Sequence, residues 1–305
     1  MFDAPGHSNY VPNMIMGACQ ADLAVLILSS NIGEFESGFE KEGQTKEHAL
    51  LAKALGVTTL ICVVTKMGLM KWSKERYDFI KNSIYPYLKD VCKYPRVEIL
   101  PIDSVDNINI DSRIPKNVCD WYDGPSVLEI LNDIEVTPKN PEGPLRIPVV
   151  DKIKEQGQLY VFGKVESGTI IEDQEVTLLP SKRSFEIKEI YDPSDVRIPY
   201  APAGENVKLK VKAIEEEDIL RGNIICNNSN YNQVCNVFQA KLHVLDLPET
   251  KKLISPGSQA VIHLHASVEN IQIEDVEAVE NVETGKMVKT TFLRSNQVGI
   301  VKIKS

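Results

Sequence analysis

Two continuous apolar stretches, Leu23-Ala-Val-Leu-Ile-Leu-Ser29 and Thr59-Leu-Ile-Cys-Val-Val64, decide the fold class of this chain. A third stretch, Val97-Glu-Ile-Leu-Pro101, follows them. Strands that are buried on both faces of a parallel sheet have such unbroken apolar sequences, because neither face meets water. The first part of the chain, residues 1–136, is therefore predicted to contain a parallel sheet.

Helical patterns separate and follow these strands, as a parallel sheet requires. Residues 46–55 are predicted to form a helix with Thr45 as its N-cap and Gly56 as the left-handed residue after its end. Apolar residues at helical spacing predict a longer helix over residues 73–92, and a short one over residues 126–131. The alternation of strands and helices predicts an open α/β domain.

The sequence pattern changes after residue 136. The proline-rich stretch Thr137-Pro-Lys-Asn-Pro-Glu-Gly-Pro144 indicates an interdomain linker. Short β patterns follow over residues 145–150, 158–165, 175–179, 185–190, 206–211 and 223–226, and, after an Asn-rich loop, over residues 237–244, 259–266, 272–279, 288–293 and 299–303. Closely spaced short strands predict barrels. We expect one β-barrel over residues 145–232 and a second, incomplete one over residues 233–305.

The bulk composition is typical of a soluble globular protein, and the cysteine pattern leads us to expect it in the cytoplasm. With 305 residues, the chain is too long for one ordinary domain. Its net charge of −9 argues against broad binding to DNA or RNA phosphates. It has no apolar run that could span a membrane, and its first residues do not resemble a secretory signal. Its six cysteines include no Cys-x-x-Cys pair, so we expect reduced thiols rather than disulfides or a zinc site.

The strongest chemical signal is the sequence Asp3-Ala-Pro-Gly-His7. It resembles the Asp-x-x-Gly motif of GTPases, in the Asp-x-Pro-Gly-His form that translation factors use. The resemblance implies that Asp3 binds Mg²⁺ through a water molecule, that the Gly6 N–H contacts the γ-phosphate, and that His7 orients the attacking water. Taken alone, a Pro-Gly-His sequence is more often an ordinary turn.

Further blocks extend this resemblance over essentially the whole chain. They are Ala18-Cys-Gln-Ala-Asp-Leu-Ala-Val25, Gly33-Glu-Phe-Glu-Ser-Gly-Phe-Glu40, Gly43-Gln-Thr-Lys-Glu-His-Ala-Leu50, Trp121-Tyr-Asp-Gly124, Gly163-Lys-Val-Glu-Ser-Gly168 and Ile214-Glu-Glu-Glu-Asp-Ile-Leu220. They are similar to the GTPases that serve as eukaryotic elongation factors and release factors. Three features look like the release-factor type: the Val11-Pro12 step, the Gly38-Phe39-Glu40 block and the acidic run 215–218. An acidic run by itself is usually a solvated turn.

The resemblance implies a fold and a function together. The fold would be part of a GTPase domain followed by two β-barrels. Such a protein binds GTP or GDP with Mg²⁺, hydrolyses GTP on the ribosome, and acts in translation termination with the class-1 release factor, the stop-codon reader. That partner is expected to dock on the second barrel, from about residue 237. The alternatives within the same branch are a ribosome-rescue GTPase and a tRNA-carrying elongation-factor-like GTPase.

One departure from the family pattern concerns the phosphates. The family places a phosphate loop, Gly-x-x-x-x-Gly-Lys-Ser/Thr, and its first switch upstream of the Asp-x-Pro-Gly-His motif, and this sequence contains neither. We therefore expect the chain to be truncated at its N-terminal end. Since the second barrel of the family continues beyond Ser305, we expect truncation at the C-terminal end as well. The absence of the phosphate loop also leaves a second hypothesis open, a non-hydrolysing relative that acts only as a binding module.

A second departure concerns the guanine base. Where the family has Asn-Lys-x-Asp, this chain has Thr65-Lys-Met-Gly68. The resemblance lets Lys66 lie along the base and makes Thr65 a weaker substitute for Asn, whereas Gly68 has no carboxylate for the guanine N–H groups. A hydrogen bond to a charged group contributes about 1.5–3 kcal/mol, so this loss predicts a guanine preference weakened by about tenfold to several hundredfold. An ordinary strand-to-loop turn is the alternative interpretation.

The last base-contacting motif of the family, Ser-Ala or Ser-Gly, has its counterpart in Pro101-Ile-Asp-Ser104. Ser104 matches the family serine and its neighbours do not, so a turn serine that caps locally is an equal alternative. Elsewhere, His263-Leu-His265 would place two imidazoles on one face of a strand. We find no third ligand at matching spacing and expect an ordinary barrel strand there.

Overall fold

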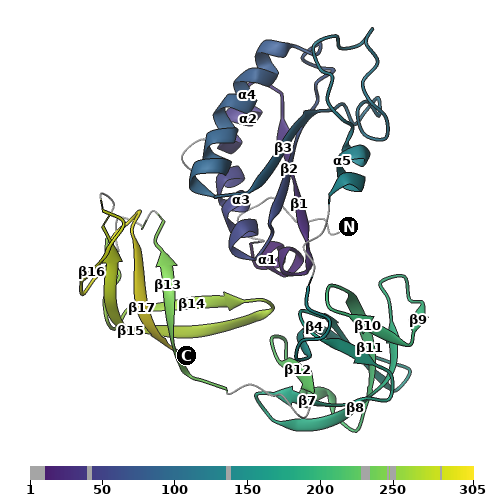
Figure 1. The fold of residues 1–305 in the computed structure, drawn as a ribbon, viewed down its shortest axis with the longest axis vertical. Helices are drawn as coiled ribbons and strands as arrows, with labels where there is room; N and C mark the ends of the chain where they lie inside the picture. The colour runs from purple at the N-terminus through teal and green to yellow at the C-terminus, as the bar shows by residue number, and fades with distance from the viewer. Residues whose placement is uncertain are drawn as a thin grey trace. The chain divides into compact units, whose positions relative to one another are not determined.

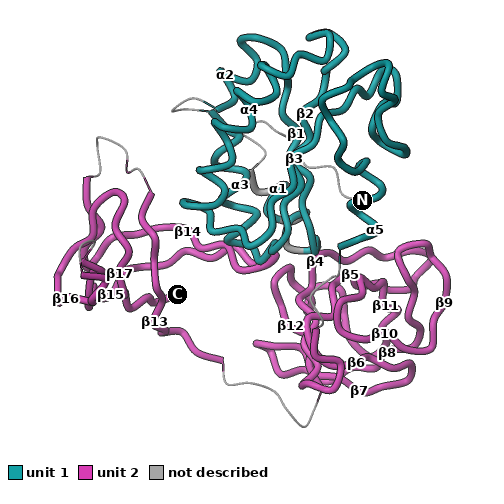
Figure 2. The backbone as a smooth tube through the Cα atoms, turned by 45° about the horizontal axis from the view of Figure 1, so that its top comes forward, with its two compact units in different colours: residues 1–138 teal, residues 139–305 magenta. Residues whose placement is uncertain are grey.

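The computed structural model describes residues 11–39, 43–134, 139–227, 234–245, 247, 252–281 and 284–305 (Figure 1). The chain divides into two compact units, residues 1–138 and residues 139–305 (Figure 2). The division falls within the predicted linker, residues 137–144. The domain limits predicted inside the second unit stay predictions.

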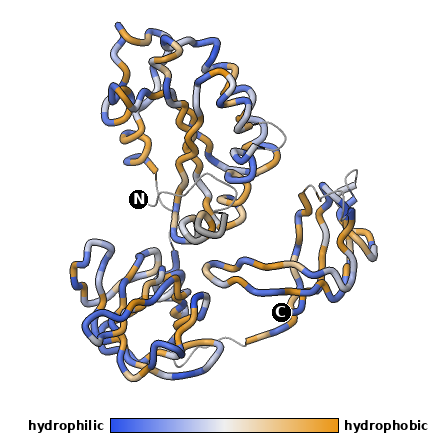
Figure 3. Tube along the Cα trace, turned by 180° about the vertical axis from the view of Figure 1, so that it is seen from behind, coloured by the Kyte–Doolittle hydropathy of each residue, from blue (hydrophilic) through white to orange (hydrophobic). Residues whose placement is uncertain are grey.

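Unit 1 is built on a three-stranded parallel sheet in the order β1-β2-β3. The strands are β1 Leu23–Ser29, β2 Thr59–Thr65 and β3 Arg96–Pro101. All three match the predicted stretches to within a residue or two. Figure 3 shows them as a largely hydrophobic band through the unit, in keeping with the unbroken apolar sequences.

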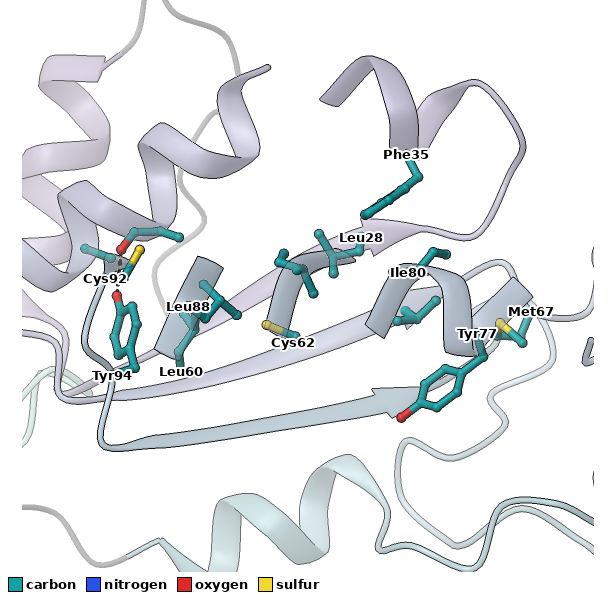
Figure 4. Packing of buried hydrophobic residues seen from close by; sticks show 14 of the residues in the cluster. Leu28, Phe35, Leu60, Cys62, Met67, Tyr77, Ile80, Leu88, Cys92 and Tyr94 are labelled. Atoms are coloured by element: carbon teal, nitrogen blue, oxygen red, sulfur yellow. Dashed lines mark hydrogen bonds between the residues drawn. The ribbon is translucent and has the colours of Figure 1, made fainter. Parts of the chain in front are cut away.

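Helices cover both faces of this sheet (Figure 1). The helices of unit 1 are α1 Val11–Gln20, α2 Glu34–Phe39, α3 Gln44–Ala54, α4 Lys74–Pro86, a π-helical turn Tyr87–Val91 that continues α4, and α5 Val127–Asp133. Alternate residues of β2 point to opposite sides: Cys62 joins the core formed with α3 and α4, whereas Ile61 joins the core formed with α5. Figure 4 shows the larger of these two cores, with Leu88 and Tyr77 packed over the strands. The predicted open α/β domain is confirmed.

The ends of the helices follow local sequence rules in most cases. Ser73 caps α4 by accepting a hydrogen bond from the N–H of Arg76, and Ser126 forms a capping box with Glu129 at the start of α5. The prediction of Thr45 as an N-cap is wrong. Helix α3 begins at Gln44 behind Gly43, so Thr45 lies inside the helix. Gly56 has a φ of +100°, as expected for the residue after a helix end.

The first domain of unit 2 is a closed barrel. Its strands are β4 Arg146–Glu155, β5 Gln158–Lys164, β6 Thr169–Ile171, β7 Glu175–Leu179, β8 Arg183–Tyr191, β9 Arg197–Ile198, β10 Tyr200–Pro202, β11 Asn206–Lys212 and β12 Ile224–Asn227. The pairing runs β11-β5-β4-β12-β7-β8, and β8 pairs again with β11, which closes the ring. Apolar side chains such as Val161, Ile187 and Leu209 fill its interior.

The second domain of unit 2 is a five-stranded antiparallel sheet in the order β13-β17-β15-β14, with β16 paired to β15. The strands are β13 Val237–His243, β14 Gln259–Leu264, β15 Ser267–Glu280, β16 Met287–Lys289 and β17 Val298–Lys304. They enclose a smaller apolar core around Ile273, Val276 and Val301. The predicted order of an α/β domain followed by β domains is confirmed.

Two details of this sheet differ from the sequence prediction. The strand predicted over residues 288–293 ends early, and Leu293 instead forms an isolated bridge with Ile254. The prediction that His263 and His265 lie on the same face of one strand is wrong. Strand β14 ends at Leu264, and His265 lies in the turn to β15 with a φ of +51°. The described part of the chain holds no group of three or more potential metal-ligating residues. Among the described residues there is also no helix that is long and apolar enough to cross a membrane.

Candidate functional site

The carboxyl ends of the three parallel strands bring the predicted base-side residues to one edge of unit 1. Ser29 at the end of β1 pairs with Thr65 at the end of β2, and Val64 pairs with Pro101 at the end of β3. The loops that leave this edge therefore start side by side. Ligands of open parallel sheets bind in the crevice outside the carboxyl ends of the strands. The edge is thus the candidate site.

The loop after β2 is fixed by a buried methionine. Met67 is fully buried in the larger core, and its N–H donates to the carbonyl oxygen of Ile102 at 3.2 Å. On the other side, the N–H of Ser30 donates to the carbonyl oxygen of Thr65 at 3.0 Å. Lys66, between these anchors, has a φ of +63°, which is unusual for a residue with a side chain and turns the chain sharply away from the strand.

The Lys66 side chain is directed to the first loop by an ion pair. Its Nζ donates to Oε2 of Glu34 at 2.6 Å. The same carboxylate accepts hydrogen bonds from Oγ of Ser29 at 2.6 Å and from Nδ2 of Asn31 at 2.9 Å. These contacts, with Lys66 first, lower the pKa of Glu34 to about 2. The two side chains are 42% and 47% exposed, so the pair contributes little stability and acts mainly by positioning Lys66.

A second, more buried cluster fixes the loop between β1 and α2. Arg76 of α4 donates from both Nη atoms to the carboxylate of Glu36, from Nε to the carbonyl oxygen of Ser30 at 2.7 Å, and from Nη2 to that of Asn31 at 2.9 Å. Oε2 of Glu36 also accepts from the N–H of Gly33 at 2.7 Å. The Arg76 side chain is 12% exposed and that of Glu36 is 31% exposed. The cluster holds the loop that carries the partner of Lys66.

This cluster predicts a defined dependence of stability on pH. The Arg76 guanidinium lowers the pKa of Glu36 from 4.5 to about 2. A carboxylate whose pKa is depressed in the folded state contributes its full stability above the unfolded value, and the contribution disappears as pH falls through the folded value. The difference in unfolding free energy between the native protein and Glu36→Gln should be constant above pH 4.5 and shrink between 4.5 and about 2. Denaturation followed by tryptophan fluorescence at several pH values measures it. A difference unchanged down to the lowest pH would contradict the assignment.

Gly68 faces an aspartate that the sequence analysis did not select. The N–H of Gly68 donates to Oδ2 of Asp103 at 2.7 Å. Oδ1 of Asp103 accepts from the N–H groups of Val105 at 2.9 Å and Asp106 at 3.4 Å. Asp103 is only 4% exposed, whereas the neighbouring Ser104 is exposed. The structure therefore brings Thr65, Lys66 and Gly68 together with Asp103, and places the Ser104 side chain at the surface.

The remaining predicted site residues cannot be placed in this geometry. Asp3, Gly6 and His7 lie outside the described residues, so their roles at Mg²⁺, the γ-phosphate and the attacking water stay predictions. The signal that could have pointed to Asp103 is its position. Asp103 follows the end of β3 by two residues and precedes Ser104, the serine that matched the family motif.

Family models match the chain along its length. The elongation factor Tu GTP-binding domain matches residues 1–180, elongation factor Tu domain 2 matches residues 159–226, and the eEF1A C-terminal domain-like family matches residues 237–305. These matches follow the order of the α/β unit, the closed barrel and the five-stranded sheet.

Among curated proteins, the chain is similar to eukaryotic peptide chain release factor GTP-binding subunits. It is 37% identical to that of Dictyostelium discoideum over 95% of this chain and 52% of the relative, and 37% identical to that of Zygosaccharomyces rouxii over 90% and 41%. The chain thus spans about half the length of these relatives. Among solved structures, sup35 complexed with GDP is 30% identical, with a TM-score of 0.52 over 100% of this chain and 72% of that one.

Proposed function

Because this chain belongs to the family of the elongation factor Tu GTP-binding domain, we propose that it is part of the GTP-binding subunit of a translation-termination factor of the release-factor type. The observation that carries the proposal is the carboxyl edge of the sheet, where the loop from Thr65 to Gly68 lies beside the loop that begins at Asp103. These loops hold the two sequences that the resemblance places at the base-contacting motifs of the family, matching them at Lys66 and Ser104. The similarity to release-factor subunits over 90–95% of the chain supports the choice within the family.

The proposed roles follow the position of each residue in the motifs. The aliphatic part of Lys66 would lie along the purine, with its ammonium group held by Glu34. Thr65, Gly68 and Ser104 would border the base. Asp3, Gly6 and His7 would serve Mg²⁺, the γ-phosphate and the attacking water, respectively. When bound, Mg²⁺ supplies charge neutralisation for the phosphates.

The proposed partners are the ribosome and the class-1 release factor that reads the stop codon. The docking surface for that factor is proposed to lie chiefly on the domain with the five-stranded sheet, from about residue 237 onward. The proposed compartment is the cytoplasm. A tRNA carrier or a ribosome-rescue GTPase would use the same nucleotide site with a different partner, so binding to the purified release factor distinguishes them.

A second candidate function is favoured by the base edge of the site. At the position that the resemblance assigns to the family aspartate, this chain has Gly68. The neighbouring carboxylate of Asp103 is buried and accepts hydrogen bonds from backbone N–H groups. A non-hydrolysing binding module, which docks on its partner without a catalytic cycle, is compatible with such a site.

The test is a titration of the purified full chain with fluorescent GDP and GTP derivatives, with and without Mg²⁺. Hydrolysis of GTP is then measured in the presence of ribosomes and the class-1 release factor. The proposed GTPase should bind both nucleotides, and His7→Ala should retain binding while hydrolysis slows. Binding without ribosome-stimulated hydrolysis would favour the binding module. Failure to bind either nucleotide would contradict the nucleotide-binding proposal itself and would likewise favour the binding module.

A further inference from the structure

The space beside Gly68 is occupied by the carboxylate of Asp103. A Cβ atom built on Gly68 would lie 2.4 Å from Oδ2 of Asp103 and 3.2 Å from its Cγ. The backbone of Gly68 is not in the left-handed region, so a side chain at this position is not excluded by backbone conformation. What excludes it is Asp103. A side chain at position 68 would collide with Asp103 unless the loop after β3 moved.

The hydrogen bonds of Asp103 are already largely used. Its carboxylate accepts three backbone N–H groups, from Gly68, Val105 and Asp106. An ionised carboxylate offers about four acceptor sites, and Oδ1 takes two of these donors. Bidentate acceptance from the guanine N1–H and N2–H₂ groups would require both oxygens to be available. The carboxylate is also buried, and its backbone contacts connect the loop after β2 to the loop after β3.

We propose that Asp103 determines the base specificity of this site by replacing the side chain at position 68 and leaving the amino edge of guanine without an acceptor. The inference rests on the proposed function, because it concerns the nucleotide that the site binds. The site then does not select for the 2-amino group of the purine. GDP and IDP, which differ only in that group, should bind with affinities equal to within about twofold, whereas a bidentate carboxylate would favour GDP by about tenfold or more.

Restoring an acceptor therefore requires two substitutions. In Gly68→Asp, the new side chain would collide with Asp103 and place two carboxylates in one small volume, which destabilises both. In Gly68→Asp/Asp103→Ser, the smaller serine frees this volume, and the carboxylate at position 68 can face the base. The double variant should unfold at a higher temperature than Gly68→Asp alone and should bind GDP about tenfold or more tightly than IDP.

The experiment compares the full chain, Gly68→Asp, Asp103→Ser and the double variant by calorimetric titration with GDP and with IDP, and by thermal unfolding. Leu69→Asp, at an exposed neighbouring position, is the control for added negative charge and should leave both readouts unchanged. A native protein that binds GDP at least about tenfold more tightly than IDP would overturn the inference while supporting nucleotide binding. The inference would also be overturned if the unfolding temperature of the double variant were no higher than that of Gly68→Asp.

The proposed function fails in a different way. If the native protein binds neither nucleotide, nucleotide binding is contradicted, and the unfolding temperatures alone decide whether Asp103 occupies the place of the side chain at position 68. A rise from Gly68→Asp to the double variant then supports that placement, and the lack of a rise overturns it.

Discussion

Replacement of Arg76 by alanine is expected to lower the free energy of unfolding of unit 1 by about 2–3 kcal/mol. The side chain is mostly buried, and its removal would leave the Glu36 carboxylate without its cation. The carbonyl oxygens of Ser30 and Asn31 would each lose one donor as well. The guanidinium also lies 5.3 Å from the ring centre of Phe79, which adds a cation–π contact. Several interactions therefore disappear together.

The matched control is Arg113→Ala in the same unit. Arg113 also binds a glutamate through two contacts, from Nε to both oxygens of Glu129, but the side chains are 61% and 44% exposed. Exposed ion pairs contribute about 0–1 kcal/mol. Both tryptophans, Trp72 and Trp121, lie in unit 1, so their fluorescence during chemical denaturation reports on this unit. If Arg76→Ala and Arg113→Ala lowered the free energy of unfolding equally, the larger contribution assigned to the Arg76 contacts would be contradicted.

Gly168→Ala is expected to destabilise the barrel of unit 2 by about 2–5 kcal/mol, the sum of backbone strain and overpacking. Gly168 has a φ of +79°, which an alanine adopts only with strain. A Cβ atom there would also lie 2.6 Å from the Cα of Leu145 and 2.9 Å from the carbonyl oxygen of Gly143. Those atoms belong to the backbone and cannot move aside as a flexible side chain would. This double constraint accounts for the glycine that ends the family-like block Gly163–Gly168.

Gly157→Ala separates the two contributions. Gly157, in the turn between β4 and β5, has nearly the same φ of +77°, but a Cβ atom there would meet nothing within 4 Å. It should lose only the strain contribution, about 1–2 kcal/mol. Amide hydrogen exchange in β4 and β5 measures both variants within the barrel itself. If Gly157→Ala lost as much stability as Gly168→Ala, backbone strain alone would account for both losses, and the contribution of overpacking at Gly168 would be contradicted.

The sequence by itself determined the elements whose signal is local. Strands β1, β2 and β3 were predicted almost to the residue from their unbroken apolar sequences. In β2 this pattern reflects burial on both faces, whereas Val25 and Ile27 of β1 are exposed, so the expected burial of both faces is wrong for β1. The capping serines of α4 and α5 act on N–H groups three residues away, so they too are visible in the sequence. The family could be identified from the sequence as well, because its motifs are short continuous stretches of residues.

Helix α2 was not predicted because it depends on distant contacts. It has only six residues and contains Gly38, so its intrinsic tendency to form a helix is weak. Phe35 packs against Phe79 of α4, and Glu36 is bound by Arg76. These partners lie about forty residues away in the chain and come close only after α4 has packed on the sheet.

Only the tertiary structure decided which residue faces Gly68. The sequence offered Ser104 as the match to a family motif, and nothing local distinguishes the direction of its side chain from that of Asp103. The bridge between Asp103 and Ile108, formed by reciprocal backbone hydrogen bonds, fixes the course of the loop after β3. That course turns Asp103 inward to the N–H of Gly68 and leaves Ser104 outside. The sequence alone showed that a glycine stands at position 68. That the carboxylate of Asp103 faces this glycine was decided by the tertiary structure, which brings together the loops after β2 and β3.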